Sequence, residues 1–426
     1  MERMEDFRGK RLLILGASPS ETSLVLRAKK YGIYTIVTDN NPDRNIARAK
    51  QYADEAWDVS WSDLDALEDL CRSHQVDGIT AGYSEFRVEN LIKLCSRLGL
   101  PCYSTMEQLE ITRDKAKFKQ ECRENGVPVV HGYDSVEEVN CFPVIVKPVD
   151  RGGSIGISVA GNRQELYRAY EYAMNMSVCK QVIIEDFIDK GTKFDVYYAI
   201  ADGEITLLTS NDVVNAEKNG FERVVQSSWL FPSTHHDAFI QKVDSQMRKM
   251  LQHMGIENGY IFFSGFVDKE DNFCFFETGF RLGGGHLYEF LERKGIVNNL
   301  DIFIAHALSG ASKAVHIGND RLPDLKCVTI NLYAKSGVLN SISGFEAVEE
   351  LDSCKFVLVN AHTGQECDGT KAILTKIGMF YCCDDSPMRI RKDVDRAYSL
   401  IKAVDDRGED MIYDRINTSL IDNWWN

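Results

Sequence analysis

The first third of the chain alternates short apolar runs with longer segments of helical periodicity. Residues 11–15 and 34–38 are two such runs, and each ends in a polar, turn-forming stretch. A third run covers 76–80, and the spacing of apolar residues predicts a helix over 85–98 that ends at Gly99. Strands that alternate with helices in this way are typical of a parallel, doubly wound sheet. We therefore expect the chain to open with a doubly wound α/β unit.

The pattern changes at residue 112, where a strongly polar helix is predicted to run to Gly126 with Thr112 as its N-cap. Residues 143–148 are predicted to form a strand, and a second strand resumes at 157–159. The segment between these strands is rich in glycine, so we expect it to join them as a hairpin. A P-loop leads from a strand into a helix, so this segment is not a P-loop.

The middle of the chain is rich in predicted strands. Apolar runs bounded by turn signals predict strands at 182–188, 194–200, 205–208, 260–268 and 273–278. Amphipathic helices are predicted over 237–254 and 299–308. From residue 326 the chain is again strand-rich, and a last helix is predicted over 394–404. The expected architecture is therefore α/β at the start, α+β in the middle and a small strand-rich unit at the end.

Composition and charge exclude several classes of protein. The chain has 426 residues, of which 44% are hydrophobic and 27% charged, and its net charge is -15. Proteins that bind nucleic acid normally carry a basic face, so the acidic balance argues against nucleic acid as a partner. The sequence contains no run of 18 apolar residues, which argues against a membrane partner.

The twelve cysteines are scattered and form no CxxC pair, which argues against zinc-ribbon and thioredoxin-like folds. Cys274 and others lie in apolar runs, where a cysteine is usually a small core residue. The first ten residues are charged and lack the apolar segment of a signal peptide. We expect a reducing, cytoplasmic location.

The strongest chemical signal is an ordered set of segments, and it begins with positive charge beside a flexible loop. Lys115 opens a predicted helix and Lys147 ends a predicted strand, and both side chains can hold phosphate oxygens as point charges. The hairpin that follows can close its backbone N–H groups over a triphosphate. The residues expected to do so are Gly152, Gly153, Ser154 and Gly156.

Acidic residues complete the ordered set. The end of a strand can offer alternating backbone groups to an adenine edge, and Glu277 is an oxygen ligand of the kind that Mg²⁺ prefers. Arg281 follows four residues later and can stabilise a transferring phosphoryl group or hold a carboxylate. The residues expected to contact the nucleotide base are Glu185, Asp186, Phe187 and Ile188.

Taken in order, these segments resemble the ATP-grasp superfamily, and most of all carbamoyl phosphate synthetase large-chain halves and carboxylate–amine ligases. Residues 13–17, 38–42 and 82–85 resemble the domain that precedes the grasp fold in those proteins. The resemblance covers about the first three quarters of the chain. It implies that ATP and Mg²⁺ bind between two lobes and that the γ-phosphate passes to a small carboxylate. An amine would then displace phosphate from the acyl phosphate.

The same resemblance assigns further residues and exposes departures. It implies that Glu85, Arg281, Gly284 and His286 line the substrate pocket, and that Asp195 or Lys193 stands where a ribose ligand is usual. A structural histidine is an equal alternative for His286, and a charge at a helix N-terminus is the alternative for Glu85. Two usual ligands of the metal site are replaced: Ser264 stands for a carboxylate or glutamine, and Gly279 stands for asparagine.

We expect a doubly wound unit over 1–105, an ATP-grasp module over 106–315 with a lid over about 118–187, and a closing unit over 316–426. The expected function is ATP-dependent ligation of a carboxylate to an amine, in a protein for which a homodimer is the default assembly. The alternatives are a degenerate nucleotide-binding regulator and an enzyme of the purine or carbamoyl phosphate type. A nicotinamide enzyme is the third alternative, although the turn after the first strand lacks the second glycine of a dinucleotide fingerprint.

Overall fold

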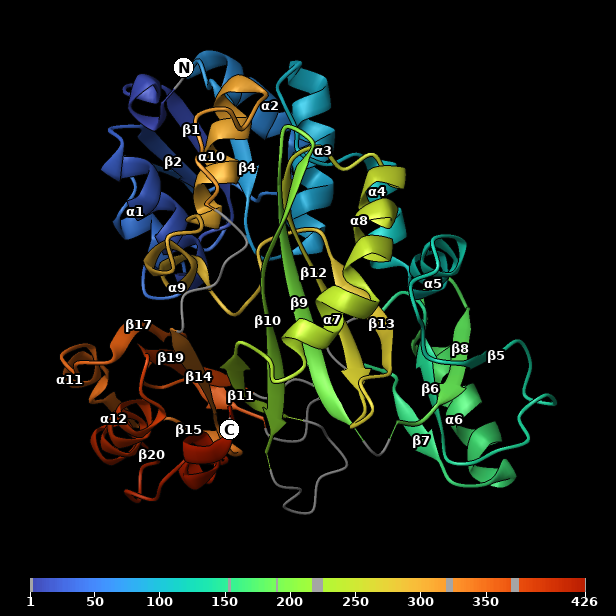
Figure 1. Cartoon of the computed structure of the whole chain (residues 1–426). Helices are drawn as coiled ribbons and strands as arrows, with labels where there is room; N and C mark the ends of the chain where they lie inside the picture. Colours follow the sequence, from blue (N-terminus) through green and yellow to red (C-terminus); the bar gives the residue numbers. More distant parts are fainter. Residues whose placement is uncertain are drawn as a thin grey trace.

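The computed structural model describes residues 3–151, 155–188, 191–216, 225–318, 325–368 and 375–425. Within those residues the strands form one eight-stranded sheet, two four-stranded sheets and two two-stranded sheets. The eight-stranded sheet lies at the centre, with the N-terminal unit, the lid and the C-terminal unit around it (Figure 1). None of the helices in these ranges is long and apolar enough to cross a membrane.

The N-terminal sheet is parallel throughout, as its alternation of strands and helices predicts. Its strand order is β3-β2-β1-β4, the arrangement of one half of a doubly wound fold. The strands are β1 (Arg11–Leu15), β2 (Tyr34–Thr38), β3 (Glu55–Trp57) and β4 (Gly78–Ala81). The helices are α1 (Thr22–Lys30), α2 (Leu64–Ser73) and α3 (Glu85–Leu98), with the 3₁₀ turns η1 (Met4–Phe7), η2 (Pro19–Glu21) and η3 (Arg48–Gln51).

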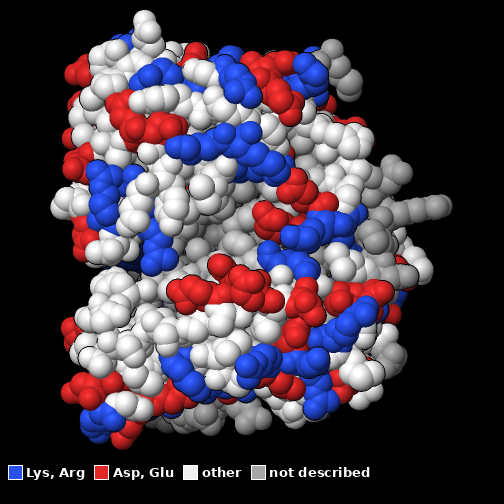
Figure 2. All heavy atoms as spheres, turned by 90° about the vertical axis from the view of Figure 1, so that its left-hand side faces the viewer, with Lys and Arg blue, Asp and Glu red and all other residues white. Residues whose placement is uncertain are grey.

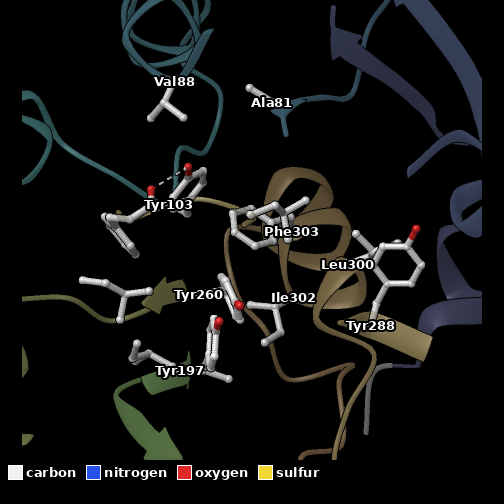
Figure 3. Packing of buried hydrophobic residues seen from close by; sticks show 14 of the residues in the cluster. Ala81, Val88, Tyr103, Tyr197, Tyr260, Tyr288, Leu300, Ile302 and Phe303 are labelled. Atoms are coloured by element: carbon white, nitrogen blue, oxygen red, sulfur yellow. Dashed lines mark hydrogen bonds between the residues drawn. The ribbon is translucent and has the colours of Figure 1, made fainter. Parts of the chain in front are cut away.

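A helix from much later in the chain completes this unit. α10 (Asn299–Ser309) packs against β4 and β1 and lies beside α1 (Figure 1). Its Asp301 is buried and accepts hydrogen bonds from Arg27 at 2.5 Å and from Tyr31 at 3.0 Å. Figure 3 shows Phe303 of the same helix packed beside Tyr103, with ring centroids 4.7 Å apart. The N-terminal unit and the central sheet therefore share one continuous core.

The region predicted as a lid, which we continue to call the lid, forms a separate antiparallel sheet with its own small core, and its movement as a lid stays a prediction. Its strand order is β5-β8-β6-β7, and the antiparallel pairing of β6 with β7 confirms the predicted hairpin. Val146, Leu166 and Ile184 are among the residues of its core. The elements are α5 (Lys115–Glu124), β5 (Gly132–Tyr133), β6 (Val144–Pro148), β7 (Ser158–Ala160), α6 (Arg163–Met176) and β8 (Val182–Asp186).

The central sheet runs through both the middle and the end of the chain. Its order is β13-β12-β9-β10-β11-β14-β19-β17, and all neighbours are antiparallel. The last three strands come from the predicted closing unit, so that unit continues the central sheet and adds two two-stranded sheets of its own, β15-β18 and β16-β20. The boundaries at 105 and 315 stay predictions. The strands are β9 (Thr192–Ala201), β10 (Glu204–Asn215), β11 (Gln226–Phe231), β12 (Gly259–Val267), β13 (Phe273–Gly279), β14 (Lys326–Tyr333), β17 (Cys354–Val359) and β19 (Lys376–Asp384).

The C-terminal unit adds short strands and helices around a second core. Trp424 donates a hydrogen bond to Asp212 at 3.0 Å and Trp425 donates one to the carbonyl of Pro232 at 2.8 Å, so the tail packs onto the central region. The remaining elements of the chain are α4 (Met106–Arg113), α7 (His236–Lys242), α8 (Asp244–His253), α9 (Tyr288–Arg293), β15 (Gly337–Val338), β16 (Ser341–Ser343), α11 (Phe345–Glu349), β18 (Glu366–Cys367), α12 (Pro387–Leu400), β20 (Lys402–Val404) and η4 (Thr418–Asn423).

Three predicted helices have other boundaries. Thr112 lies inside α4, and Asp114 caps α5 instead, because its carboxylate accepts hydrogen bonds from the N–H groups of Ala116 and Lys117. The helix predicted over 237–254 breaks into α7 and α8 at Val243, where φ is -131°. The helix predicted over 394–404 begins earlier, at Pro387, and its last residues form β20 instead.

One face of the molecule is hollowed where the N-terminal unit lies above the C-terminal unit. Figure 2 shows basic side chains bordering this hollow from above and a run of acidic side chains below it. Charges of both signs are interspersed over this face.

Candidate active site

The centre of the site is a buried cluster of charge within the lid. Lys147, on β6, forms an ion pair with Glu185 of β8 at 2.5 Å. Lys119, on α5, forms an ion pair with the other carboxylate oxygen of Glu185. All three side chains are buried, at 5%, 1% and 3% exposure for Lys147, Glu185 and Lys119. One carboxylate faces two ammonium groups, so the cluster has an excess of positive charge that an anion would balance.

Burial perturbs both lysines of this cluster. Burial lowers the pKa of Lys147 to about 8, while the charge of Glu277 raises it and the charge of Lys115 lowers it. Burial, followed by the charge of Lys147, lowers the pKa of Lys119 to about 7. A bound anion would favour the charged form of each ammonium. The structure therefore brings Lys115, Lys147 and Glu185 into one electrostatic neighbourhood.

The glycine-rich hairpin adjoins this cluster. Gly152, Gly153 and Ser154 lie outside the described residues. Lys115, the first residue of α5, donates a hydrogen bond to the carbonyl of Arg151 at 2.6 Å, at the entrance of that hairpin. Gly156 has φ 77°, and a Cβ there would lie 2.7 Å from the side chain of Pro148, so the chain requires glycine at this position.

The strand end that is expected to meet the nucleotide base shows the alternation of a β-strand. Glu185 faces the lysines, whereas Asp186 faces away and accepts a hydrogen bond from Tyr133 at 2.7 Å. The N–H of Phe187 donates to the carbonyl of Pro143 at 3.2 Å. Asp186 is thus held by its own lobe, and contact of Asp186, Phe187 and Ile188 with a nucleotide stays a prediction.

A β-bulge shapes the floor of the site, the name we give to strands β10, β9, β12 and β13 of the central sheet. In the pairing of β12 with β13, Ser264 faces Glu277 and Gly265 faces Phe275, so Phe276 is an extra residue. Bulges of this kind re-aim side chains and are common beside active sites. The ammonium groups of Lys147 and Lys193 both lie over the ring of Phe276, 5.3 Å and 5.6 Å from its centroid. Lid and floor therefore meet at Phe276 and Glu277.

Polar residues form a row across four strands of the floor. The register pairs Asn211 with Asp195, Asp195 with Ser264, and Ser264 with Glu277. Ser264 donates a hydrogen bond to Asp195 at 2.6 Å, and Asn211 donates a longer one at 3.4 Å. Burial raises the pKa of Asp195. Ribose contact by Asp195 stays a prediction, since its carboxylate is engaged within this row.

Gly279 has a steric reason to be glycine. It pairs with Phe262 across the sheet, and a Cβ at residue 279 would lie 2.5 Å from the Phe262 ring. The ring thus occupies the space into which the asparagine expected from the resemblance would extend its side chain. The guanidinium of Arg281 lies over the same ring, 5.4 Å from its centroid.

Two residues predicted to bind substrate meet at the far end of this floor. Arg281 forms an ion pair with Glu85, the first residue of α3, with both Nε and one terminal nitrogen 3.1 Å from one carboxylate oxygen. Gly284 is exposed, and a Cβ there would touch nothing within 4 Å. The opposite charges of this pair remain partly exposed, so a zwitterionic ligand has access to both.

His286 has the environment of a structural histidine. It is 3% exposed, adopts φ 52° and stacks on Phe356 with ring centroids 5.4 Å apart. It also lies 3.3 Å from the hydroxyl of Ser20. Burial lowers the pKa of His286 to about 3, so the ring is neutral at physiological pH. His286 lies between Ser20 of the N-terminal unit and Phe356 of the C-terminal unit. This environment favours a structural role for His286 over substrate binding.

Sequence reasoning missed three members of the site. Lys119 lies one helical turn after Lys115, a spacing that could have indicated it. Phe276 reaches the site through the bulge, and Asn211 through the pairing of β10 with β9. Neither the bulge nor that register is visible in a single sequence.

Carboxylates in the floor fit a divalent cation held together with a phosphate ligand. No group of three His, Cys, Asp or Glu side chains that could hold a metal by itself is found in the residues that the structure describes. Glu277 and Asp195 nevertheless provide oxygen donors, and Mg²⁺ is usually held by one or two carboxylates plus phosphates and water. The donor set is therefore suited to magnesium bound as a nucleotide complex.

Comparison with known sequences points to the same region of the chain. Residues 94–228, which include Lys115, Lys147 and Glu185, match the family described as D-ala D-ala ligase C-terminus. A 2-oxoglutarate carboxylase small subunit from Hydrogenobacter thermophilus is 30% identical over 188 residues, which cover 40% of this chain and 39% of that protein. A formate-dependent phosphoribosylglycinamide formyltransferase from Francisella tularensis is 28% identical over 217 residues, covering 47% of this chain and 50% of that protein. The chain thus matches about half the length of these relatives or less.

Solved structures resemble nearly the whole chain. An L-amino acid ligase from Bacillus licheniformis has a TM-score of 0.73 at 18% identity, covering 94% of this chain and 99% of that one. The biotin carboxylase domain of the Hydrogenobacter thermophilus 2-oxoglutarate carboxylase has a TM-score of 0.72 at 18% identity, covering 97% and 93%. Together with the parallel N-terminal sheet, the antiparallel lid and the central sheet, these matches identify the chain as a protein with the ATP-grasp fold.

Proposed function

We propose that the protein is an ATP-dependent ligase. It activates a small carboxylate as an acyl phosphate and joins it to an amine, with release of ADP and phosphate. The related 2-oxoglutarate carboxylase domain has been solved with MgADP and bicarbonate, which supports the same nucleotide and metal for this chain.

One observation carries this proposal: positive charge on the lid meets negative charge on the floor. The ammonium of Lys147 lies 5.3 Å from the ring of Phe276, and the neighbouring Glu277 is close enough to raise the pKa of Lys147. A triphosphate in this gap would contact lysines on one side and a metal-binding acid on the other. Such an arrangement neutralises phosphate charge on both faces, which is the main requirement of phosphoryl transfer.

The side chains act by positioning and charge neutralisation. Lys115 and Lys147 hold the phosphates as point charges. Magnesium bound at Glu277 would supply further neutralisation of the phosphate oxygens. Arg281 would hold the substrate carboxylate through its guanidinium, and such positioning lowers the barrier to transfer.

The pairing of Arg281 with Glu85 favours an amine and a carboxylate as substrates. A guanidinium suits a carboxylate, and a glutamate suits an ammonium group. A phosphosugar would meet repulsion from Glu85, and bicarbonate has no ammonium group for Glu85 to recognise. The pair therefore supports amino-acid-like substrates over those of the purine or carbamoyl phosphate type.

The direct test is phosphate release from ATP in the presence of Mg²⁺ and mixtures of amino acids and other small carboxylates. The proposal predicts release only when both a carboxylate and an amine are present, and a ligated product of matching mass. Release with bicarbonate alone, or with a phosphoribosyl amine, would favour the other enzyme types.

A non-catalytic nucleotide-binding regulator is the second candidate. The observation that favours it is Phe262, whose ring fills the space of a usual metal-site asparagine. Metal-dependent ATP binding without turnover under any substrate mixture would support that candidate. A cytoplasmic location and a homodimeric assembly stay predictions.

A further inference from the structure

The metal site of the proposed ligase lacks a carboxylate at residue 264, and the sheet register supplies one beside it. Ser264 pairs with Glu277 on β13 on one side and with Asp195 on β9 on the other. Residues that pair directly across antiparallel strands place their side chains on the same face, about 4.5–5.5 Å apart. Asp195 is therefore the residue of β9 that directly faces Ser264. Its carboxylate can reach the space that a longer acidic side chain at residue 264 would occupy.

The hydrogen bonds of Asp195 direct its carboxylate toward that space. The hydroxyl of Ser264 donates to one oxygen of Asp195 at 2.6 Å, so the serine holds the carboxylate of Asp195 close to residue 264. Asn211 donates to the other oxygen at 3.4 Å, and Tyr197 donates to the Asn211 carbonyl oxygen at 2.6 Å. Because Tyr197 fixes which way the amide of Asn211 points, the acid is oriented by a buried chain of neutral groups.

The charges of Lys193 and Lys147 act on Asp195 and Glu277 respectively, but within the described residues neither acid forms an ion pair. Asp195 is 5% exposed and accepts hydrogen bonds from uncharged groups. Across the described residues, no hydrogen bond or ion pair involves the side chain of Glu277, which is partly buried. Two neighbouring carboxylates that are not held in an ion pair, one buried and one partly buried, therefore offer oxygen atoms to which a cation can bind.

We propose that Asp195 supplies the second carboxylate of the magnesium site whose first carboxylate is Glu277, in place of an acid at residue 264. This inference rests on the proposed function, because the cation is the one bound with ATP. Ser264 is then a positioning residue that holds Asp195, and the carboxylate has moved one strand along the sheet while the site keeps its charge.

The first experiment measures metal and nucleotide binding rather than turnover. The affinity for ADP is measured by calorimetry in EDTA and again in rising Mn²⁺, and bound Mn²⁺ is followed by electron paramagnetic resonance. D195N is compared with D195N/S264D, which returns the carboxylate to residue 264. D244N, which alters a partly buried acid on α8 that pairs with Arg248, is the matched control.

We expect D195N to keep its metal-free affinity for ADP within about twofold and to need at least about tenfold more Mn²⁺, the usual effect of losing a group at a metal site. D195N/S264D should recover most of that loss, and D244N should resemble the wild type. An unchanged Mn²⁺ requirement in D195N overturns the inference while leaving the proposed function intact. A wild-type protein that binds no nucleotide overturns both.

A second measurement uses the unaltered protein and so does not depend on the folding of a variant. Crystals grown with ADP and Mn²⁺ are examined by anomalous scattering to locate the metal. The expected position is about 2.1 Å from an oxygen of Asp195 and from one of Glu277. A metal bound at Glu277 but well beyond coordination distance from Asp195 would contradict the inference.

Discussion

The two sides of the proposed nucleotide site, the lid and the floor, differ in how far their side chains match the ATP-grasp resemblance. On the lid, Lys147 and Glu185 form one buried ion pair at 2.5 Å, and the contact of each with a nucleotide stays a prediction. On the floor, Ser264 and Gly279 stand where the resemblance leads us to expect metal ligands, and the structure places an acid beside the first and an aromatic ring beside the second. The contrast teaches that the expected charged side chains are present on the lid, whereas on the floor the acid nearest to Ser264 on the β9 side lies one strand away.

The lid provides the largest expected effect. K147M removes the buried ammonium but keeps a side chain of similar length, so ATP affinity should fall about 100-fold, the value of one or two charge-assisted hydrogen bonds. Equilibrium dialysis with labelled ATP measures this. K249M, at an exposed position of α8, is the control and should bind as the wild type does. Equal ATP affinities of K147M and the wild type would show that the lid does not bind ATP through Lys147.

The next effect concerns the substrate end of the floor. R281K loses the forked geometry that holds a carboxylate, so kcat/KM for the carboxylate substrate should fall about 30-fold while ATP affinity stays the same. R293K, at an exposed position of α9, is the matched control. An equal loss of ATP affinity in R281K would show that Arg281 serves the nucleotide rather than the carboxylate.

The pH dependence of ATP binding tests the role of the two buried lysines of the lid. Burial lowers the pKa of Lys147 to about 8 and that of Lys119 to about 7 in the free protein, and bound phosphate should raise both. Protons are therefore taken up on binding, so affinity is greatest at low pH. It should fall by up to about tenfold per pH unit between pH 7 and 8, and by up to about a hundredfold per pH unit above pH 8, until the pKa values in the complex are reached. Calorimetry in buffers of different ionisation enthalpy measures the uptake, and a pH-independent affinity would contradict the prediction.

The floor provides the smallest effect. G279N restores the usual asparagine in sequence, but its Cβ would lie 2.5 Å from the ring of Phe262. We expect a loss of about 1 kcal/mol in the free energy of unfolding, at the low end for overpacking, and no gain in metal affinity. Urea denaturation measures the first quantity. The double variant F262A/G279N should relieve the clash, and a G279N protein with tighter metal binding would show that the ring does not occupy the ligand's place.

Much of this account could be predicted from the sequence because its signals are local. The strand and helix alternation, the hairpin between β6 and β7, and the helix from Glu85 follow from patterns within short segments. Lys115, Lys147 and Glu185 could be found because each is the first or the last but one residue of its element. Short-range signals also placed Glu277 at the end of an apolar strand.

The rest depends on contacts that one sequence does not order. The partnership of Asp195 with Ser264 requires the register of β9 with β12, and the exposure of Phe276 to the site requires a bulge. The packing of α10 on the N-terminal sheet joins segments far apart in the chain. The break at Val243 and the cap at Asp114 were missed because periodicity alone continues across both.

The most direct test of the central claim is a calorimetric titration of a non-hydrolysable ATP analogue with Mg²⁺ into the wild type and into K147M/E277Q. The wild type should bind one analogue per chain with an affinity that Mg²⁺ increases. The double variant, which removes one charge from each side of the cleft, should give no measurable binding. Equal binding by both proteins, or none by the wild type, would contradict a nucleotide held between Lys147 and Glu277.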